Sequence, residues 1–335
     1  MISFAIGRIK ATQSSTVSGN GSGSVPVNVA VMDTGVQLDR PDLNVVGGHN
    51  CIGDDPKAFD NHDPIGHGRM VAGFIGARDN AIGLVGSAPG ARIWSVRSID
   101  RTGFGTTSEI ICGLDWVAST RLDNNQNNDI QVLNMSLGGP EPDDANCGLS
   151  QGVAFHRAVC GVTDLGVTSV VSAGNETIDF ADVGPASFSE VLTVTAMADR
   201  DAMPGSHGGL MQCLLALGIE QNDDEFAFFS NYATLFSDRS HVVSAPGACI
   251  SSTFPGSQYA VSSGTSFSAP LVSGVVALCI WSGPCAGLTP QQIVAKIVAD
   301  ATAYNQAHPE YGYLGDPQHP VTGRYYGYLV NAALY

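Results

Sequence analysis

The sequence predicts an α/β fold in which a mostly parallel central sheet carries helices on both faces. Short apolar runs rich in β-branched residues alternate with longer helix-like stretches, which is typical of parallel sheets. The 335 residues are 44% hydrophobic and only 14% charged, a composition that suits one large buried core. Because no internal repeat or charged linker is evident, we expect a single domain over residues 27–335, preceded by a lead-in segment at residues 1–26.

The first strand is expected in the run VNVAVMDTG, which starts at residue 27 and stops at Asp33. A continuous apolar run that ends at an aspartate and a glycine is typical of a buried parallel strand. Further strands are expected at 93–96, 130–139, 167–175 and 191–197. Helices are expected at 67–77, 107–121, 150–165, 266–282 and 289–301.

Small or polar residues follow three of the expected strands directly. These segments are Asp33-Thr34-Gly35, Ser136-Leu137-Gly138-Gly139 and Ala173-Gly174-Asn175. In open parallel sheets, ligands bind beyond the carboxyl ends of the strands. We therefore expect the three segments to line one crevice.

The acidic composition argues against a nucleic-acid partner. The net charge is −16, and the only lysines are Lys10, Lys57 and Lys296, so the surface repels phosphate backbones. No run of about 18 apolar residues is present, and we expect no membrane-spanning segment. The first residues lack the apolar run and cleavage site of a signal peptide. The chain is therefore either cytoplasmic or a mature form without its targeting segment.

The cysteines favour the second of these alternatives. Their number is even and their spacing matches no zinc motif, which favours disulfides and an oxidising compartment over eight reduced core thiols. Eight cysteines allow 105 pairings, among which Cys279–Cys285 is the easiest local closure and Cys213 could pair with Cys249. The candidates are Cys51, Cys112, Cys147, Cys160, Cys213, Cys249, Cys279 and Cys285.

The stretch GTSFSAPLVSG, at residues 264–274, contains a candidate nucleophile. Proline is tolerated only near a helix start, so Pro270 indicates that the helix begins close to Ser266. At that position Ser266 lies among free backbone N–H groups, which favour developing negative charge. Ser268 is about 200° further around the helix and is expected to face the packed side. Ser266 is therefore the predicted nucleophile.

A serine needs a base to take its proton and a carboxylate to orient that base. Five segments together resemble the subtilisin-like serine proteases of the subtilase family: DTG at Asp33, GHGRMVAG at His67, SLGG at 136–139, AGN at Asn175 and GTSFSAP at Ser266. Each segment alone has an ordinary explanation, such as a strand-end turn or a helix start, but five in this order are very specific. The order Asp, His, Ser is that of subtilisin.

The resemblance implies a subtilisin-like three-layer fold and a serine endopeptidase that acts on polypeptide substrates. It implies catalytic roles for Asp33, His67 and Ser266, and a place for Asn175 in the oxyanion hole beside the Ser266 N–H. The two edges that clamp an extended substrate peptide would be Gly103, Phe104 and Gly105 on one side and Ser136, Leu137, Gly138 and Gly139 on the other.

The stretch ARDNAIGLVG, at residues 77–86, resembles the calcium loop of the family, with a plain loop as the alternative. Asp42 and the Asn80 side chain would match ligands, together with the carbonyls of Arg78, Ile82 and Leu84. Hard oxygen donors of this kind suit calcium. We expect structural calcium and no organic cofactor.

Two departures from the family pattern leave a second function open. Arg69 and Met70 stand where the family usually has threonine and histidine, so the chain could be a weak or inactive relative that binds peptides in the same cleft. The intact set of Asp33, His67, Ser266 and Asn175 favours the enzyme. Family members are usually exported, and we expect a secreted monomer whose signal and propeptide are not in this chain, with its own propeptide as a further partner.

Overall fold

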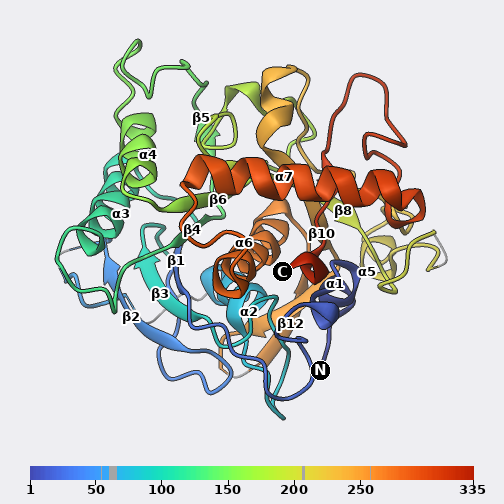
Figure 1. Ribbon diagram of the computed structural model, residues 1–335, viewed down its shortest axis with the longest axis horizontal. Coiled ribbons are helices and arrows are strands. Elements are labelled where there is room, and N and C mark those ends of the chain that lie inside the picture. Colours follow the sequence, from blue (N-terminus) through green and yellow to red (C-terminus); the bar gives the residue numbers. More distant parts are fainter. Residues whose placement is uncertain (54, 60–65, 206–207, 257) are drawn as a thin grey trace.

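The computed structural model describes residues 1–53, 55–59, 66–205, 208–256 and 258–335, and its centre is a nine-stranded sheet (Figure 1). Eight strands follow the order β13-β10-β8-β6-β4-β1-β3-β2 with parallel neighbours, and β9 pairs antiparallel with β8. The strands are β1 (Asn28–Asp33), β2 (Val45–Asn50), β3 (Arg92–Arg97), β4 (Val132–Met135), β6 (Thr168–Ser172), β8 (Leu192–Ala198), β9 (Glu225–Phe226), β10 (Val242–Ala248) and β13 (Tyr328–Leu329). The mostly parallel sheet is as predicted.

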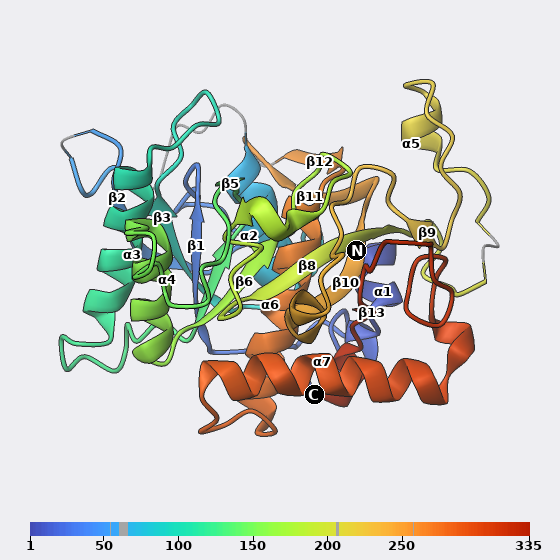
Figure 2. The ribbon, with the colours of Figure 1, turned by 90° about the horizontal axis from the view of Figure 1, so that it is seen from above.

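Helices cover both faces of the sheet (Figure 2). They are α1 (Phe4–Arg8), α2 (His67–Gly76), α3 (Thr107–Thr120), α4 (Ala154–Asp164), α5 (Gln212–Leu215), α6 (Thr265–Ser282) and α7 (Pro290–Ala307). Side chains of a strand alternate between faces. Accordingly, Val29 and Val31 of β1 belong to the core cluster that includes α2, α6 and α7, whereas Ala30 and Met32 belong to the cluster beneath α3 and α4.

Two short antiparallel pairs lie outside the main sheet. The first joins β5 (Gly139–Pro140) to β7 (Val183–Gly184), and the second joins β11 (Ile250–Phe254) to β12 (Gln258–Ser262). The short 3-10 turns are η1 (Ala11–Gln13), η2 (Phe180–Asp182), η3 (Ser237–His241), η4 (Pro309–Tyr311) and η5 (Ala332–Leu334).

The helix α6 is the central helix of the fold. It begins at Thr265, one residue before the predicted start, with Pro270 still in its first turns. Among the described helices it is the one long and apolar enough to cross a membrane, but 78% of it is buried inside the protein. Burial of this extent is expected for a core helix that is hydrophobic on all sides.

All eight cysteines form disulfides. The two pairings that the sequence favoured, Cys279–Cys285 and Cys213–Cys249, are both confirmed. The other two disulfides are Cys51–Cys112 and Cys147–Cys160. Cys51–Cys112 ties the end of β2 to α3, and Cys213–Cys249 ties α5 to the end of β10. Cross-links of this kind restrict the unfolded chain.

The first residues of the chain are packed into the core. Within α1, Arg8 is 1% exposed and forms ion pairs with Asp224 at 2.7 Å and Asp199 at 3.3 Å. Burial raises the pKa of Asp199 to about 8, against the opposing effect of Arg8. The backbone of Ile9 also accepts a hydrogen bond from Ala332, so the two ends of the chain are joined. We therefore expect the lead-in segment to contribute to stability.

The buried His241 is expected to contribute stability that is lost in mild acid. Burial lowers the pKa of His241 to about 4, whereas the unfolded chain takes up the proton near pH 6.5. Because the folded state resists protonation of His241, this contribution to stability is complete above about pH 6.5 and is lost as the pH falls towards 4, whereas the raised pKa of Asp199 acts in the opposite direction. A difference of this size corresponds to about 3 kcal/mol.

Urea unfolding between pH 7 and 4 measures this effect. The variant His241→Gln, which cannot take up the proton, is expected to lose about 3 kcal/mol less stability than the wild type between pH 7 and 4. His308, whose side chain is 47% exposed, provides the matched control, and His308→Gln should leave the profile unchanged. Equal slopes for the wild type and His241→Gln would contradict the prediction.

Candidate active site

The end of β1 and the start of α2 bring Asp33 and His67 together. His67 Nδ1 lies 2.8 Å from Asp33 Oδ1 and 2.9 Å from Asp33 Oδ2. Asp33 is 2% exposed, whereas the His67 side chain is 25% exposed, so the imidazole can still reach a bound molecule. The carboxylate also accepts a hydrogen bond from the backbone N–H of Thr34 at 2.7 Å. The geometry is that of a carboxylate that fixes the tautomer of a base.

The close approach of α2 to β1 depends on a glycine. A Cβ atom at Gly68 would lie 2.5 Å from the carbonyl oxygen of Gly35, which is closer than real side chains approach. The Gly68 N–H donates to Thr34 Oγ1 at 3.0 Å and so ties the first turn of the helix to the strand end. This contact explains why glycine follows His67 in the sequence.

Ser266 is the second residue of α6 and the one partly exposed hydroxyl of its segment. Thr265 and Ser268 are fully buried, and Ser268 Oγ donates to the carbonyl of Pro246 at 3.1 Å, as its predicted inward orientation requires. The ring of Phe267 lies 5.2 Å from the His67 ring. The helix start therefore places Ser266 next to the residue that contacts the candidate base.

Asn175 follows β6 in the loop between residues 173 and 178. Its Oδ1 atom accepts hydrogen bonds from the N–H of Thr265 at 2.8 Å and from Thr265 Oγ1 at 3.0 Å. Since a backbone N–H can only donate, the atom of the Asn175 amide that faces Thr265 must be the oxygen. The Nδ2 hydrogens therefore point away from Thr265. The side chain is thereby fixed beside the start of α6, where the candidate nucleophile Ser266 lies.

A groove of about 500 Å³ extends from Asp33 and His67. All seven predicted substrate-binding residues line it: Gly103, Phe104, Gly105, Ser136, Leu137, Gly138 and Gly139. The lining includes neither Ser266 nor Asn175. Ser136 connects the groove to the helix, because its Oγ donates to the Ser266 carbonyl at 2.7 Å. Phe104 is 78% exposed at the rim, so an apolar surface is open to a bound chain.

The groove also contains residues that the sequence does not predict. They are Ile99, Thr107, Ile110, Pro140, Glu141, Phe155 and Gly184. Gly184 reaches the groove because β7 pairs with β5, a contact between segments far apart in the chain. The Thr106 side chain caps α3 by accepting from the Glu109 N–H, and this helix start supplies Thr107 and Ile110. The capping motif T-x-x-E was the available signal for that helix start.

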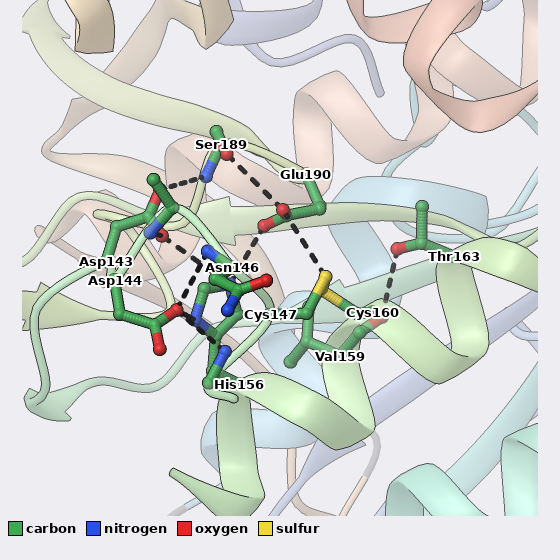
Figure 3. The surroundings of a disulfide bond; sticks show 12 residues. Asp143, Asp144, Asn146, Cys147, His156, Val159, Cys160, Thr163, Ser189 and Glu190 are labelled. Atoms are coloured by element: carbon green, nitrogen blue, oxygen red, sulfur yellow. Dashed lines mark hydrogen bonds and ion pairs between the residues drawn. A yellow bond between two sulfur atoms is a disulfide. The ribbon is translucent and has the colours of Figure 1, made fainter. Parts of the chain in front are cut away.

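The loop that follows this groove edge is held by a disulfide and a buried histidine (Figure 3). Cys147–Cys160 ties the loop to α4, and His156 of α4 is fully buried with Nε2 3.0 Å from Glu190 Oε2. Burial alone would lower the pKa of His156, but the carboxylate of Glu190, with those of Asp143 and Asp144, raises it above its usual value. These contacts fix the loop on the protein.

A buried carboxylate outside the expected calcium loop, that of Asp42, lies against the loop and has an oxygen without a hydrogen-bond partner among the described residues. Asp42 is 1% exposed, its Oδ2 accepts from Tyr259 at 3.0 Å, and its Oδ1 has no hydrogen-bond partner among the described residues. Burial raises the pKa of Asp42. A Cβ atom at Gly83 would lie 2.3 Å from Asp42 Oδ2, so only glycine fits there. An orphaned buried carboxylate beside a tight loop fits a hard cation.

The two departures from the family pattern lie inside the protein. Arg69 is 7% exposed and Met70 is 3% exposed, and both belong to the buried part of α2. The Arg69 carbonyl accepts from Thr253 Oγ1 at 2.6 Å, and neither residue lines the groove. Both residues therefore lie where backbone carbonyls of α2 accept hydrogen bonds from side chains of β11, those of Thr253 and Ser252.

Comparison with known proteins agrees with this geometry. Residues 25–313 match the Subtilase family (Peptidase_S8). Among curated relatives, M-protease of Shouchella clausii (strain KSM-K16) is 33% identical over 277 residues, which are 83% of this chain and 59% of that protein. Subtilisin Savinase of Lederbergia lenta is 32% identical, with 83% of each chain covered.

The fold is also shared with a solved structure, described as a crystal structure of a cold adapted subtilisin-like serine proteinase. The TM-score is 0.65 at 26% identity, and the match covers 93% of this chain and 91% of that chain. The three-layer α/β fold is therefore the subtilisin-like fold that the sequence predicts. The chain belongs to the subtilase family of serine peptidases.

Proposed function

We propose that the chain is a serine endopeptidase that hydrolyses peptide bonds of proteins through an acyl-enzyme on Ser266. The observation that carries the proposal is the Asp33–His67 pair, which lines the groove, together with the partly exposed Ser266 at the start of α6. A groove that only binds peptides would not require a buried carboxylate directed at a half-buried histidine. The membership of the subtilase family supports the same reaction class.

In the first step, Ser266 Oγ attacks the peptide carbonyl carbon while His67 Nε2 takes the hydroxyl proton. Asp33 holds Nδ1 of the ring and stabilises the imidazolium. The carbonyl oxygen becomes negative and receives hydrogen bonds from Asn175 Nδ2 and the Ser266 N–H. The C–N bond then breaks, and His67 returns the proton to the leaving amine. Water repeats the sequence on the acyl-enzyme, which releases the acid and restores Ser266.

The two edges of the groove are proposed to hold the substrate by its backbone. Gly103, Phe104 and Gly105 lie on one edge, and Ser136 to Gly139 lie on the other, so an extended peptide could add a strand between them. Backbone pairing accepts any sequence and leaves the choice of substrate to side-chain pockets.

Casein and a chromogenic peptide test the proposal. New amino termini within casein, detected by mass spectrometry, are expected for an endopeptidase. Saturable binding of peptides to a chain that releases no products would instead favour the peptide-binding relative and contradict the proposal.

The setting of the enzyme is proposed from its cross-links and its relatives. Four disulfides over eight cysteines fit an oxidising compartment, so we propose an extracellular monomer whose propeptide is a further partner. The single domain over residues 27–335 remains part of this proposal.

Calcium is proposed to bind at the loop beside Asp42, with Asn80 and the carbonyls of Arg78, Ile82 and Leu84 as further ligands. Its role would be structural, because bound calcium would stabilise the folded chain. At a free concentration of about 100 times its dissociation constant, a ligand that binds only the folded state stabilises that state by about 2.7 kcal/mol.

Calcium removal is therefore expected to lower the melting temperature by several degrees, as thermal unfolding in calcium and in EDTA would show. Asp42→Asn should melt at nearly the same temperature in both, whereas Asp115→Asn, which removes an exposed carboxylate from α3, should behave like the wild type. Acid should weaken the effect, since protonation of Asp42 competes with the cation. A wild type unaffected by EDTA would contradict the assignment.

A further inference from the structure

We propose that Asn231 is a positioning residue for the oxyanion hole, which fixes the loop that carries Asn175. The inference rests on the proposed function, because it concerns the same reaction. Asn231 itself is fully buried and lies beneath the loop, so it acts through Asn175 and not on the substrate.

Both the oxygen and the nitrogen of the Asn231 side-chain amide form hydrogen bonds with this loop. Its Oδ1 atom accepts from the N–H groups of Glu176 at 2.9 Å and Ile178 at 3.1 Å. Its Nδ2 atom donates to the carbonyl of Ala173 at 3.0 Å and to Glu176 Oε2 at 2.8 Å. The backbone N–H of Asn231 also donates to the Gly174 carbonyl at 3.0 Å. One buried residue therefore contacts the loop on both sides of Asn175.

The same network reaches the backbone of Asn175. Glu176 Oε2, which accepts from Asn231, also accepts from the Asn175 N–H at 2.8 Å. The Asn175 side chain is held independently by Thr265, whose hydroxyl also accepts from the Gly174 N–H at 3.1 Å. Asn175 is thus fixed at its amide group by α6 and at its backbone by Asn231 through Glu176.

Gly174 allows Asn231 to come this close. Its φ is +101°, and a Cβ atom there would lie 2.2 Å from Asn231 Nδ2. Any larger residue would push the asparagine away from the Ala173 carbonyl. The glycine before Asn175 is therefore explained by the contact below the loop as well as by the turn itself.

Fixed donors matter because an oxyanion hole acts through preorganisation. The donors must already point at the position where the charge develops, and a misplacement of about 1 Å can cost roughly 10²-fold in rate. Asn175 and Glu176 are both exposed, so solvent would compete for a loop without a buried partner. Asn231 supplies that partner.

The variant Asn231→Asp tests the inference, because it keeps the shape and the Oδ1 acceptor but loses both Nδ2 hydrogen bonds. We expect kcat to fall about 10- to 100-fold while KM stays within about twofold, since the binding edges are untouched. Asn305→Asp is the matched control. Asn305 is also fully buried and donates from Nδ2 to two carbonyls, those of Ala301 and Leu329, in and beside α7. Its variant should melt at a lower temperature with kcat unchanged.

A double-mutant cycle separates positioning from general damage. On an Asn175→Ala background the hole has lost its side-chain donor, so Asn231→Asp should lower kcat by less than about threefold. A loss as large as in the wild-type background, or an unchanged kcat in the single variant, would overturn the inference.

Glu176→Ala gives a second route if Asn231→Asp does not fold. It removes only the carboxylate link, and we expect a kcat loss that Glu176→Gln largely restores, since the amide oxygen can still accept from Asn175 and Asn231. Equal losses in the two variants would count against the link. Absence of any Ser266-dependent hydrolysis in the wild type would instead refute the proposed function itself.

Discussion

The substitution Ser266→Ala is expected to lower the rate of peptide-bond hydrolysis about 10⁶-fold, with little change in KM. Without its Oγ atom the chain has no group that can form the acyl-enzyme, while the groove keeps its lining. The magnitude is taken from the related enzyme subtilisin, where removal of the serine or the histidine costs about 2 × 10⁶ in kcat. The measurement is the steady-state hydrolysis of a chromogenic peptide.

Ser268→Ala is the matched control for this substitution. It removes a hydroxyl two residues away on the same helix, where Oγ is buried and donates to the Pro246 carbonyl. A small loss of stability is expected, with kcat retained. Equal losses of activity in the two variants would mean that Ser266 acts only through the packing of α6.

The substitution Asp33→Asn is expected to lower kcat about 10⁴-fold at neutral pH. Both carboxylate oxygens lie within 2.9 Å of His67 Nδ1, and an amide at this position could donate from its NH2 group to Nδ1, which favours the wrong tautomer of the ring. The same substitution in the serine protease triad gives about this loss, although the geometry is kept.

Asp316→Asn controls for the loss of a buried carboxylate. Asp316 is fully buried and accepts hydrogen bonds from the N–H groups of Tyr313, Gln318 and His319. Its variant should be less stable without a change in kcat. If Asp33→Asn kept its kcat, the orientation of His67 would not depend on Asp33.

The main elements of the fold could be predicted because local patterns agree with the final structure. The residues between Asn28 and Asp33 are all apolar, and β1 is buried on both faces. The strand β10 was missed because Pro246 and Gly247 interrupt its pattern, and a register shift occurs at this point. The helix α7 runs six residues beyond its predicted end at 301, since Asn305 is buried and bonded to the Leu329 carbonyl.

The site residues could be predicted only where they lie in short segments with a distinctive local sequence. Four residues each lie in a glycine-rich segment next to a strand end or helix start, so the local sequence predicts their roles: Asp33, His67, Ser266 and Asn175. Asn231 has no such context, because its contacts join residues 53 to 58 positions apart in the chain. Partners of that kind follow from tertiary packing and carry no local signal.

The most direct test of the central claim is intact-mass analysis after reaction with a fluorophosphonate, with peptide mapping of the product and a calcium-chelated control. A single adduct on Ser266 is predicted, because labelling requires the base, the nucleophile and the oxyanion hole to be assembled together. A folded, calcium-loaded chain that takes no label, or takes it on another residue, would contradict the account.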